Sequence, residues 1–367
     1  MTTTHRICVL PGDGIGVEVI DATLVLLEKL QRGAGFELQF ATHPAGALHY
    51  KATGEALPDA TFAAAKAADA ILFGAMGWPE IRYPDGTEIA PQLDLRFRLG
   101  LFAGVRPARM IPGIAPVLAD PRARDIDLVL VRESTEGLFA SRGNGVVVED
   151  REARDTMVIT RAGSERVHEF AFRLAERRSA RRQTHAPGSG KAARVTCVDK
   201  ANVFVSMAFF RKVFDEVALR HPGIGADHHY VDATALDLVR KPWTFDVMVT
   251  ENMYGDILSD QAAALIGGMG MAPSADVGHS HAVFQPCHGS APDIAGQGKA
   301  NPTATFLSAA MMLDWLAERS GNESLAVAAA TLERAVDTVF AGGRIRPFEL
   351  GGGDGTLAIR DAVLSNL

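Results

Sequence analysis

The 367-residue chain is poor in cysteine and has no long apolar run. Its cysteines, Cys8, Cys197 and Cys287, lie far apart and form no CxxC pair, which argues against a disulfide framework or a thiolate zinc site. No apolar segment approaches the roughly 18–20 residues that span a bilayer, and the N-terminus lacks the apolar region and cleavage site of a signal peptide. We therefore expect a cytoplasmic protein with no membrane partner.

Positive charge is also in deficit. Lys and Arg number 37 against 44 Asp and Glu, which gives a net charge of −7. Phosphate contacts need an excess of basic residues, so no nucleic-acid partner is expected. The content of apolar residues (47%) and charged residues (22%) is typical of a soluble globular enzyme.

Short apolar segments alternate with helical patterns along the sequence. Strands are predicted at 7–10, 70–73, 128–131, 195–198 and 247–250, and helices at 17–30 and 57–68. This alternation predicts an α/β protein with a mainly parallel sheet covered on both faces. A glycine-rich turn, 11–16, follows the first strand. Val17 stands where the dinucleotide fingerprint requires its third glycine, so a Rossmann fold is not indicated.

Two polar segments interrupt this pattern. Residues 142–159 hold two short β-like runs, 145–148 and 156–159, and predict a hairpin arm. Residues 177–194 are rich in arginine around Pro187 and Gly188. A basic run can bind an anionic partner, but we interpret this one as a solvated loop between a helix and a strand.

Three acids are candidate metal ligands. If a helix begins near Ile257, Asp256 and Asp260 lie one turn apart on the same face. Two carboxylates this close favour a hard cation between them, such as Mg²⁺ or Mn²⁺, and Asp232 is a candidate third ligand. An N-capping Asp256 with a solvated Asp260 explains the spacing equally well.

Cationic residues cluster near predicted strand ends. Arg96 and Arg106 lie close in sequence, and Arg132 ends an apolar strand, which is the pattern that a small polycarboxylate substrate would require. Lys200 follows another predicted strand and is a candidate base. Taken alone, Lys200 is better explained as one half of a salt bridge.

The motifs together resemble one family, the metal-dependent, β-decarboxylating 2-hydroxyacid dehydrogenases, which include the isocitrate and isopropylmalate dehydrogenases. The resemblance rests on the segments 11–16, 95–96, 105–107, 132–137, 198–203, 251–260, 288–296 and 301–302, which cover nearly the whole chain in the family's order. It implies a two-domain fold, with a cofactor-binding domain of 1–101 and 267–367. A second domain of 102–266 would carry the arm and the dimer interface.

The resemblance also implies roles for individual residues. Arginines would grip the carboxylates of a malate-like acid, and nearby side chains would meet its C3 substituent: Arg96, Arg106, Arg132, Gln92, Leu93 and Val203. Magnesium or manganese would bind Asp256 and Asp260 of one subunit. The catalytic Lys200 and the third ligand, Asp232, would come from the other subunit of a homodimer. NAD would be held by Gly14, Ile15, Ala75, His288, Gly289, Ser290, Ala291, Asp293 and Asn301, with Asp293 at the ribose hydroxyls disfavouring NADP.

The chain departs from the family's pattern at Phe139, where a tyrosine usually protonates the enol formed after decarboxylation. Phenylalanine cannot donate a proton. Gln92 likewise stands where isopropylmalate enzymes place a leucine. We rank a 3-isopropylmalate dehydrogenase-like activity slightly ahead of tartrate or D-malate dehydrogenase, followed by isocitrate or homoisocitrate dehydrogenase. A weakly catalytic regulatory subunit is the alternative from another class.

Overall fold

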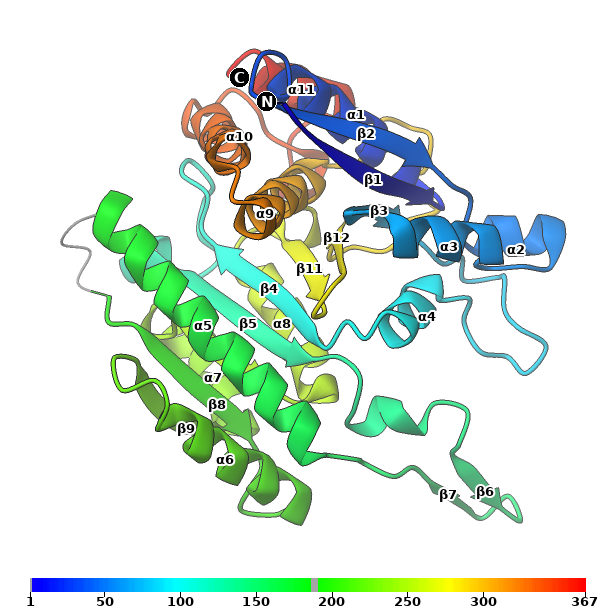
Figure 1. Ribbon diagram of the computed structural model, residues 1–367, viewed down its shortest axis with the longest axis vertical. Helices are drawn as coiled ribbons and strands as arrows, with labels where there is room; N and C mark the ends of the chain where they lie inside the picture. Colours follow the sequence, from blue (N-terminus) through cyan, green and yellow to red (C-terminus); the bar gives the residue numbers. More distant parts are fainter. Residues whose placement is uncertain (1, 186–190) are drawn as a thin grey trace. The chain divides into compact units, whose positions relative to one another are not determined.

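The computed structural model describes residues 2–185 and 191–367, which divide into two compact units. Unit 1 comprises 1–100, 111–115 and 266–367, and unit 2 comprises 101–110 and 116–265. The short segment 111–115 belongs to unit 1, although it lies between two stretches of unit 2 in the sequence. Each unit is an α/β body (Figure 1).

Unit 1 carries strands in the order β2-β1-β3-β12-β11. Their bounds are β1 Thr3–Gly12, β2 Phe36–Thr42, β3 Ala70–Ala75, β11 Pro273–Val277 and β12 Ala282–Pro286. The pairs are parallel except β11 with β12. The helices are α1 Ile15–Leu30, α2 Ala47–Thr53, α3 Asp59–Ala67, α4 Pro91–Arg98, α9 Thr303–Ser320, α10 Glu323–Ala341 and α11 Thr356–Leu364.

The core of unit 1 follows from its buried central strands. Every residue of β3, β11 and β12 is buried, as expected for strands covered on both faces. Helix α9 packs on β11 and β12, and α1 packs on β3 and against α11. Because β1, β3 and β12 are parallel neighbours, their carboxyl ends meet at one edge, where α/β folds bind ligands.

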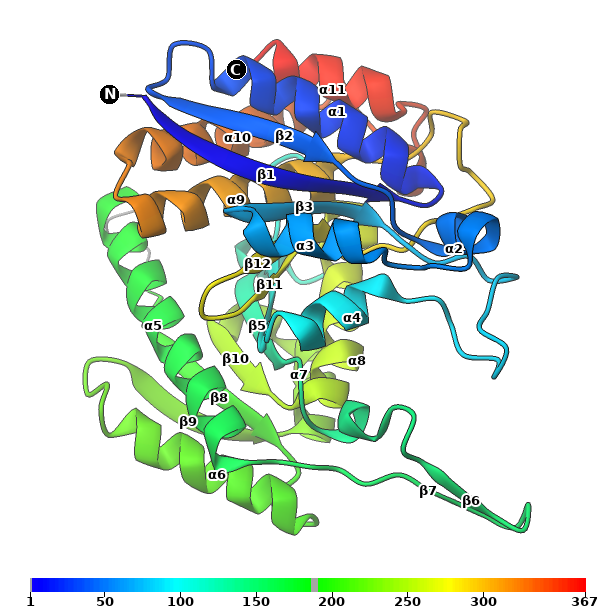
Figure 2. The ribbon, with the colours of Figure 1, turned by 45° about the vertical axis from the view of Figure 1, so that its right-hand side comes forward.

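Unit 2 carries strands in the order β4-β5-β10-β8-β9, and only β4 with β5 is antiparallel among these pairs. The bounds are β4 Ala103–Arg109, β5 Asp127–Glu133, β8 Arg194–Asp199, β9 Gly225–Tyr230 and β10 Val247–Thr250. The helices are α5 Arg161–His185, α6 Val205–Ala218, α7 Val231–Arg240 and α8 Asn252–Leu265. Helices α5 and α6 lie on one face of these strands and α7 and α8 on the other (Figures 1 and 2). The expected fold class, α/β with a mainly parallel sheet, is confirmed.

The arm is a two-stranded hairpin that extends away from the other elements of unit 2 (Figure 2). Its strands are β6 Val146–Val148 and β7 Glu152–Arg154, all exposed. The expectation that 156–159 forms the second strand is wrong. The chain turns after only three residues beyond β6, so the second strand is Glu152–Arg154. Val158 instead forms a bridge with Gly137.

The first half of the basic run is helical rather than a solvated loop, since α5 continues to His185. Residues 186–190 lie outside the described residues, and 191–193 lead into β8. Arg178 and Arg182 both pair with the buried Asp246, at 3.0 and 2.8 Å. Basic side chains of the run therefore compensate the charge of a buried acid instead of facing only solvent. None of the helices in the described ranges is long and apolar enough to cross a membrane.

Candidate active site

The carboxyl ends of four parallel strands in unit 2 carry most of the predicted catalytic residues. Arg132 lies at the end of β5, and α8, with Asp256 and Asp260, follows β10. Lys200 follows β8, and Asp232 lies in the first turn of α7 after β9. The parallel pairing of β5, β10, β8 and β9 places these strand ends at one edge.

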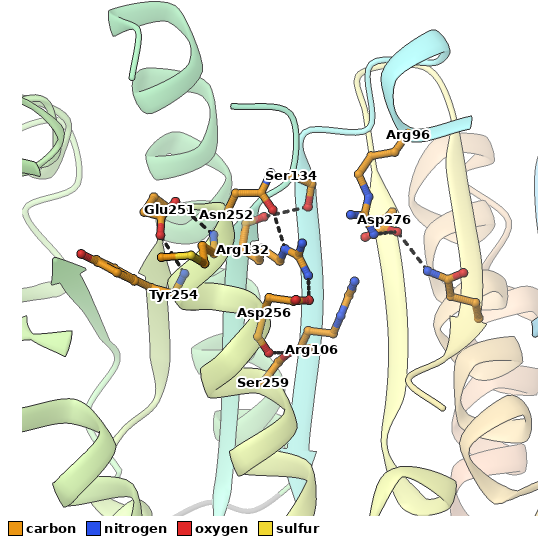
Figure 3. A network of polar contacts seen from close by, with 12 residues as sticks. Arg96, Arg106, Arg132, Ser134, Glu251, Asn252, Tyr254, Asp256, Ser259 and Asp276 are labelled. Carbon is orange, nitrogen blue, oxygen red and sulfur yellow. Dashed lines mark hydrogen bonds and ion pairs between the residues drawn. The ribbon is translucent and has the colours of Figure 1, made fainter. Parts of the chain in front are cut away.

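Arg132 is buried and held from two sides. Its Nε donates to Asn252 Oδ1 at 2.8 Å, and its Nη1 is ion-paired with Asp256 (Figure 3). Asn252 is itself fixed, because its amide donates to the carbonyl of Glu136 at 3.0 Å. The guanidinium is therefore fixed in direction, which suits a group that grips a carboxylate.

Helix α8 presents the two predicted metal acids. Glu251 precedes the helix and accepts from the amides of Met253 and Tyr254, so Glu251 satisfies the helix start and Asp256 is not the cap. Burial and the negative charge of Asp256 raise the pKa of Asp260. Two carboxylates one helical turn apart fit a site for a divalent cation.

Arg106 lies on β4 and is buried. Its positive charge lowers the pKa of Asp260, against the larger effect of burial, and so does that of Arg132. Unit 2 thus combines two cations and two carboxylates around one helix face.

Phe139 lies on a short 3₁₀ helix, Leu138–Ser141, directly after the Arg132 segment. Its ring centroid is 4.9 Å from the guanidinium carbon of Arg132, a cation–π distance. The Phe139 ring therefore contacts Arg132, although it carries no hydrogen-bond donor.

Lys200 and Asp232 form a close pair, with Nζ 2.6 Å from Oδ1. The side chain of Lys200 is 24% exposed and that of Asp232 is 67% exposed. The hydrogen bond from Lys200 lowers the pKa of Asp232. Val203 is also exposed and closes the turn after Lys200, with its amide donating to the Lys200 carbonyl.

Within residues 2–185 and 191–367 of one chain, no group of three His, Cys, Asp or Glu side chains could hold a metal ion. Asp232 therefore does not complete a site with Asp256 and Asp260 in a single copy. The expectation that Asp232 acts on the site of a second subunit stays a prediction.

The glycine-rich turn of unit 1 is organised around a buried acid, Asp13. Its carboxylate accepts from the amides of Ala47, Leu48 and Gly77 at 2.7 to 2.9 Å. It thereby caps α2 and fixes the loop after β3. Gly14 has φ of +56° and contacts Ser290, where an added Cβ would lie 2.0 Å from the carbonyl oxygen.

Most predicted cofactor residues gather at the carboxyl edge of β1, β3 and β12. The amide of Ile15 donates to the Ser290 carbonyl at 2.8 Å, and the Ser290 hydroxyl donates to the Gly77 carbonyl. The apolar surface beneath packs Ile15 against Ala291 and Ala300. Ala75 ends β3, and its carbonyl accepts from the amide of Asp13. The segment 288–301 is thus joined to the first turn of the chain.

Two predicted cofactor side chains have restricted roles. Burial lowers the pKa of His288, whose Nδ1 lies 2.9 Å from the adjoining Gly289 carbonyl. The amide of Asn301 is engaged with Thr303 and Glu349. Asn301 thus shapes the segment, whereas Nε2 of His288 is buried and has no hydrogen-bond partner among the described residues.

Asp293 lines an open cavity of about 830 Å³ within unit 1. Trp78 and Tyr50 supply aromatic walls. Lys51 and Arg82 supply positive charge, and Glu80 and Asp293 supply negative charge. An aromatic and charged cavity beside the 288–301 segment can accept part of a nucleotide.

Arg96, on α4, is buried and paired within unit 1. Its Nη2 lies 2.9 Å from Oδ2 of Asp276 on β11 (Figure 3). One turn earlier, Gln92 has a buried Oε1 with no hydrogen-bond partner among the described residues, and Leu93 is partly buried beside it.

Sequence reasoning assigned no role to Asn252, Asp13 or Asp276. Asn252 and Asp13 lie inside motifs that carry the resemblance. Asp13 lies between two glycines and Asn252 follows a strand end, and these positions could have indicated a structural role. Asp276 stands alone in an apolar strand, and its partner is 180 residues away. Nothing in the local sequence indicates that contact.

Comparison with known proteins agrees with this geometry. The profile of the isocitrate/isopropylmalate dehydrogenase family matches residues 6–363. A 3-isopropylmalate dehydrogenase from Moorella thermoacetica is 42% identical over 351 residues, 94% of this chain and 92% of that enzyme. A 3-isopropylmalate/3-methylmalate dehydrogenase from Methanocaldococcus jannaschii is 41% identical and covers 98% of both chains.

The crystal structure of an isocitrate dehydrogenase from Methylococcus capsulatus superposes with a TM-score of 0.83, at 37% identity and 99% coverage of both chains. The fold, the order of the motifs and these relatives agree. The chain belongs to the isocitrate/isopropylmalate dehydrogenase family of decarboxylating dehydrogenases.

Proposed function

We propose that the protein oxidises and decarboxylates a malate-like (2R)-hydroxy dicarboxylic acid, with NAD as oxidant and Mg²⁺ or Mn²⁺ as metal. The observation that carries this proposal is the cluster of Arg132, Asp256 and Asp260, with the Lys200–Asp232 pair at the same strand edge of unit 2. A 3-isopropylmalate dehydrogenase-like reaction ranks first. Tartrate or D-malate ranks second because Gln92 offers a polar group to the C3 substituent.

The arginines bind the substrate in this proposal. Arg96, Arg106 and Arg132 would have the role that the resemblance implies, which is to bind the carboxylates. Leu93 and Val203 would supply apolar surface for the C3 substituent, with Gln92 beside it. The fixed direction of Arg132 supports this role, since oriented donors lose little entropy when a carboxylate binds.

Asp256 and Asp260 would hold the divalent cation, and Asp232 of a second subunit would complete its ligands. Bound there, the cation would stabilise negative charge on the substrate's C2 oxygen. Lys200, oriented by Asp232, would accept the proton from the C2 hydroxyl. Bound NAD would supply the acceptor for the hydride from C2. The carboxylate on C3, then β to a carbonyl, would be lost as CO₂ and leave its electron pair on C3 as an enolate. Phe139 orients Arg132 but leaves the later protonation of C3 to water or another group.

NAD is proposed over NADP because Asp293 would face the ribose hydroxyls and repel a 2′-phosphate. The Gly14–Ile15 turn and the segment 288–301 would form the cofactor's binding surface. A homodimer is proposed because Lys200 and Asp232 would act across the subunit interface, with the arm contributing to that interface. The three dispersed cysteines, none of which forms a disulfide among the described residues, support a cytoplasmic location.

The test is a panel of acids, namely 3-isopropylmalate, D-malate, tartrate, isocitrate and homoisocitrate, supplied with NAD and Mn²⁺. NADH and CO₂ are measured together. We expect both products from at least one acid, and loss of both after exhaustive chelation, with recovery on adding Mn²⁺. Turnover that survives chelation would refute the metal assignment.

A regulatory subunit is the second candidate, favoured by Phe139 at the position of the usual proton donor. That function predicts no NADH from any acid in the panel. NADH formation from a single acid would eliminate it.

A further inference from the structure

Tyrosine and tryptophan are scarce in this chain, yet three of them gather at one place in unit 1. The whole chain has 4 Tyr and 3 Trp. Tyr50, Tyr83 and Trp78 all pack against a buried cluster that contains Ala47 and Ile89. The rings of Tyr50 and Tyr83 meet edge to face, with centroids 5.1 Å apart. The mechanism above gives this aromatic group no role.

The backbone beside Trp78 is held from two sides. The amide of Gly77 donates to Asp13 Oδ2 at 2.9 Å, and the Gly77 carbonyl accepts from the Ser290 hydroxyl. The carbonyl of Trp78 itself accepts from the amide of Ile81 at 2.9 Å, which closes a turn. The Trp78 ring is therefore carried by a loop that is joined to both the glycine-rich turn and the 288–301 segment. Its position is set before any ligand binds, which reduces the entropy lost on binding.

Trp78 is half-buried and lines the open cavity of about 830 Å³ in unit 1. This volume lies within the range of roughly 300–1,000 Å³ that is typical of small-molecule sites. The charged side chains of the cavity are Lys51, Arg82, Glu80 and Asp293, whose formal charges cancel. A cavity without net charge does not favour a dicarboxylate, whereas its aromatic walls suit a flat, uncharged ring.

We propose that Trp78 is the stacking partner of the adenine of NAD. The inference rests on the proposed function, in which Asp293 faces the hydroxyls of the adenosine ribose. Adenine is bonded directly to that ribose, so it would lie in the cavity that Asp293 and Trp78 line together. Stacking uses the π-face of the base and needs no hydrogen-bond donor from the indole. Trp78 would thus select the adenosine half of the cofactor and take no part in hydride transfer.

The test measures the binding of two fragments of NAD by calorimetric titration. ADP-ribose keeps the adenosine half, and nicotinamide mononucleotide lacks it. Trp78→Leu keeps an apolar side chain on the loop but removes the aromatic face, so its Kd for ADP-ribose and for NAD should rise about 5- to 100-fold, the usual range for one stacked base. Its Kd for nicotinamide mononucleotide should stay unchanged. Trp78→Phe keeps a smaller aromatic face and should recover most of the affinity for ADP-ribose.

Trp243→Leu is the matched control, because Trp243 is also half-buried but lies in unit 2. Its affinities should equal those of the wild type. A folded Trp78→Leu protein with the wild type's affinity for ADP-ribose would overturn the inference alone, and so would a loss confined to nicotinamide mononucleotide.

A second measurement decides if Trp78→Leu fails to fold. Saturating ADP-ribose should quench the indole emission of the wild type more than that of Trp78→Phe, because a stacked base lies against the Trp78 ring. Equal quenching in the two proteins would overturn the inference. A wild type that binds neither NAD nor ADP-ribose would overturn the proposed function and this inference together.

Discussion

The candidate binding surfaces of units 1 and 2 differ in the chemical groups that form them. In unit 1 the turn 12–16 and the segment 288–301 are joined largely through backbone amides and carbonyls, with Gly14 against Ser290. In unit 2 the corresponding strand edge presents charged side chains, Arg132, Asp256 and Lys200, each paired with an opposite charge. One surface is defined by shape and the other by charge.

The difference predicts different sensitivities. A surface made of close backbone contacts does not tolerate an added atom at a close approach. A surface made of charge pairs tolerates small changes of volume but not the loss of one charge, because the partner is left uncompensated. The predictions below separate these two behaviours.

The largest effect is expected at Lys200. Lys200→Met removes the proposed base and leaves Asp232 unpaired, so kcat should fall about 10²–10⁴-fold, the usual contribution of a general base. NAD affinity, measured by calorimetric titration, should stay unchanged because it depends on unit 1. Lys212→Met, at an exposed position on α6, is the control and should behave as the wild type. A parallel loss of NAD affinity in Lys200→Met would contradict the separation of roles.

A gain is expected at Phe139, the apolar member of the charged cluster. Phe139→Tyr keeps the ring beside Arg132 and adds a donor, so turnover on the best acid should rise, by up to about 10²-fold if protonation limits the rate. If the natural reaction stops at the keto acid, CO₂ should instead rise relative to NADH. A variant with the parent's rate and the parent's product ratio would show that another group already supplies the proton.

The shape of unit 1 is tested at Gly14. Gly14→Ala would place Cβ 2.0 Å from the Ser290 carbonyl at a φ of +56°. Strain of about 1–3 kcal/mol should weaken NAD binding roughly 10–100-fold, measured by calorimetry, with kcat at saturating NAD changed little. Gly33→Ala has a similar φ, +75°, and no described atom within 4 Å of its Cβ. Unchanged NAD binding in Gly33→Ala would show that the loss in Gly14→Ala comes from the contact with Ser290 and not from a positive φ alone.

The smallest effect concerns the core of unit 2. Burial lowers the pKa of His168 to about 3, while its Nε2 lies 3.1 Å from the Phe210 carbonyl. The unfolded chain, with a pKa near 6.5, then binds one more proton than the folded chain between these values. The free energy of unfolding should therefore fall by at most about 1.4 kcal/mol per pH unit as the pH drops below about 6.5.

His168→Gln should reduce that slope, measured by urea denaturation at pH 6.5, 5.5 and 4.5. His279→Gln, at an exposed position, should keep the slope of the wild type. Equal slopes in all three proteins would mean that His168 does not contribute to acid sensitivity.

The sequence predicts the features that depend on local patterns. Apolar runs identify the buried strands β3, β5 and β10, because strands covered on both faces leave few polar positions. The i, i+4 spacing of Asp256 and Asp260 predicts a shared helix face because a helix turns every 3.6 residues. The second strand of the arm was misplaced, since turn length in an exposed, valine-rich hairpin is weakly specified.

Ion pairs between residues that are far apart in the sequence cannot be predicted from local patterns. The sequence indicates that Arg178 and Arg182 are surface residues. In the structure, α5 places both against Asp246, which is 64 or more residues away in the sequence. The pairing of Arg96 with Asp276 likewise requires β11 to lie beside α4's buried face. Roles that the resemblance assigns to single residues, such as Lys200 and Asp293, stay predictions because the structure fixes their position and not their chemistry.

The division of unit 1 into two stretches of sequence has a consequence for synthesis on the ribosome. Strands β1, β2 and β3 emerge first, but their neighbours β12 and β11 follow only after residue 265. Nearly all of unit 2 is a continuous stretch that emerges in between and can complete its own sheet. The nascent chain therefore has to carry an unfinished half-sheet with apolar strands while unit 2 folds. That interval is when the protein is most exposed to aggregation and most dependent on chaperones.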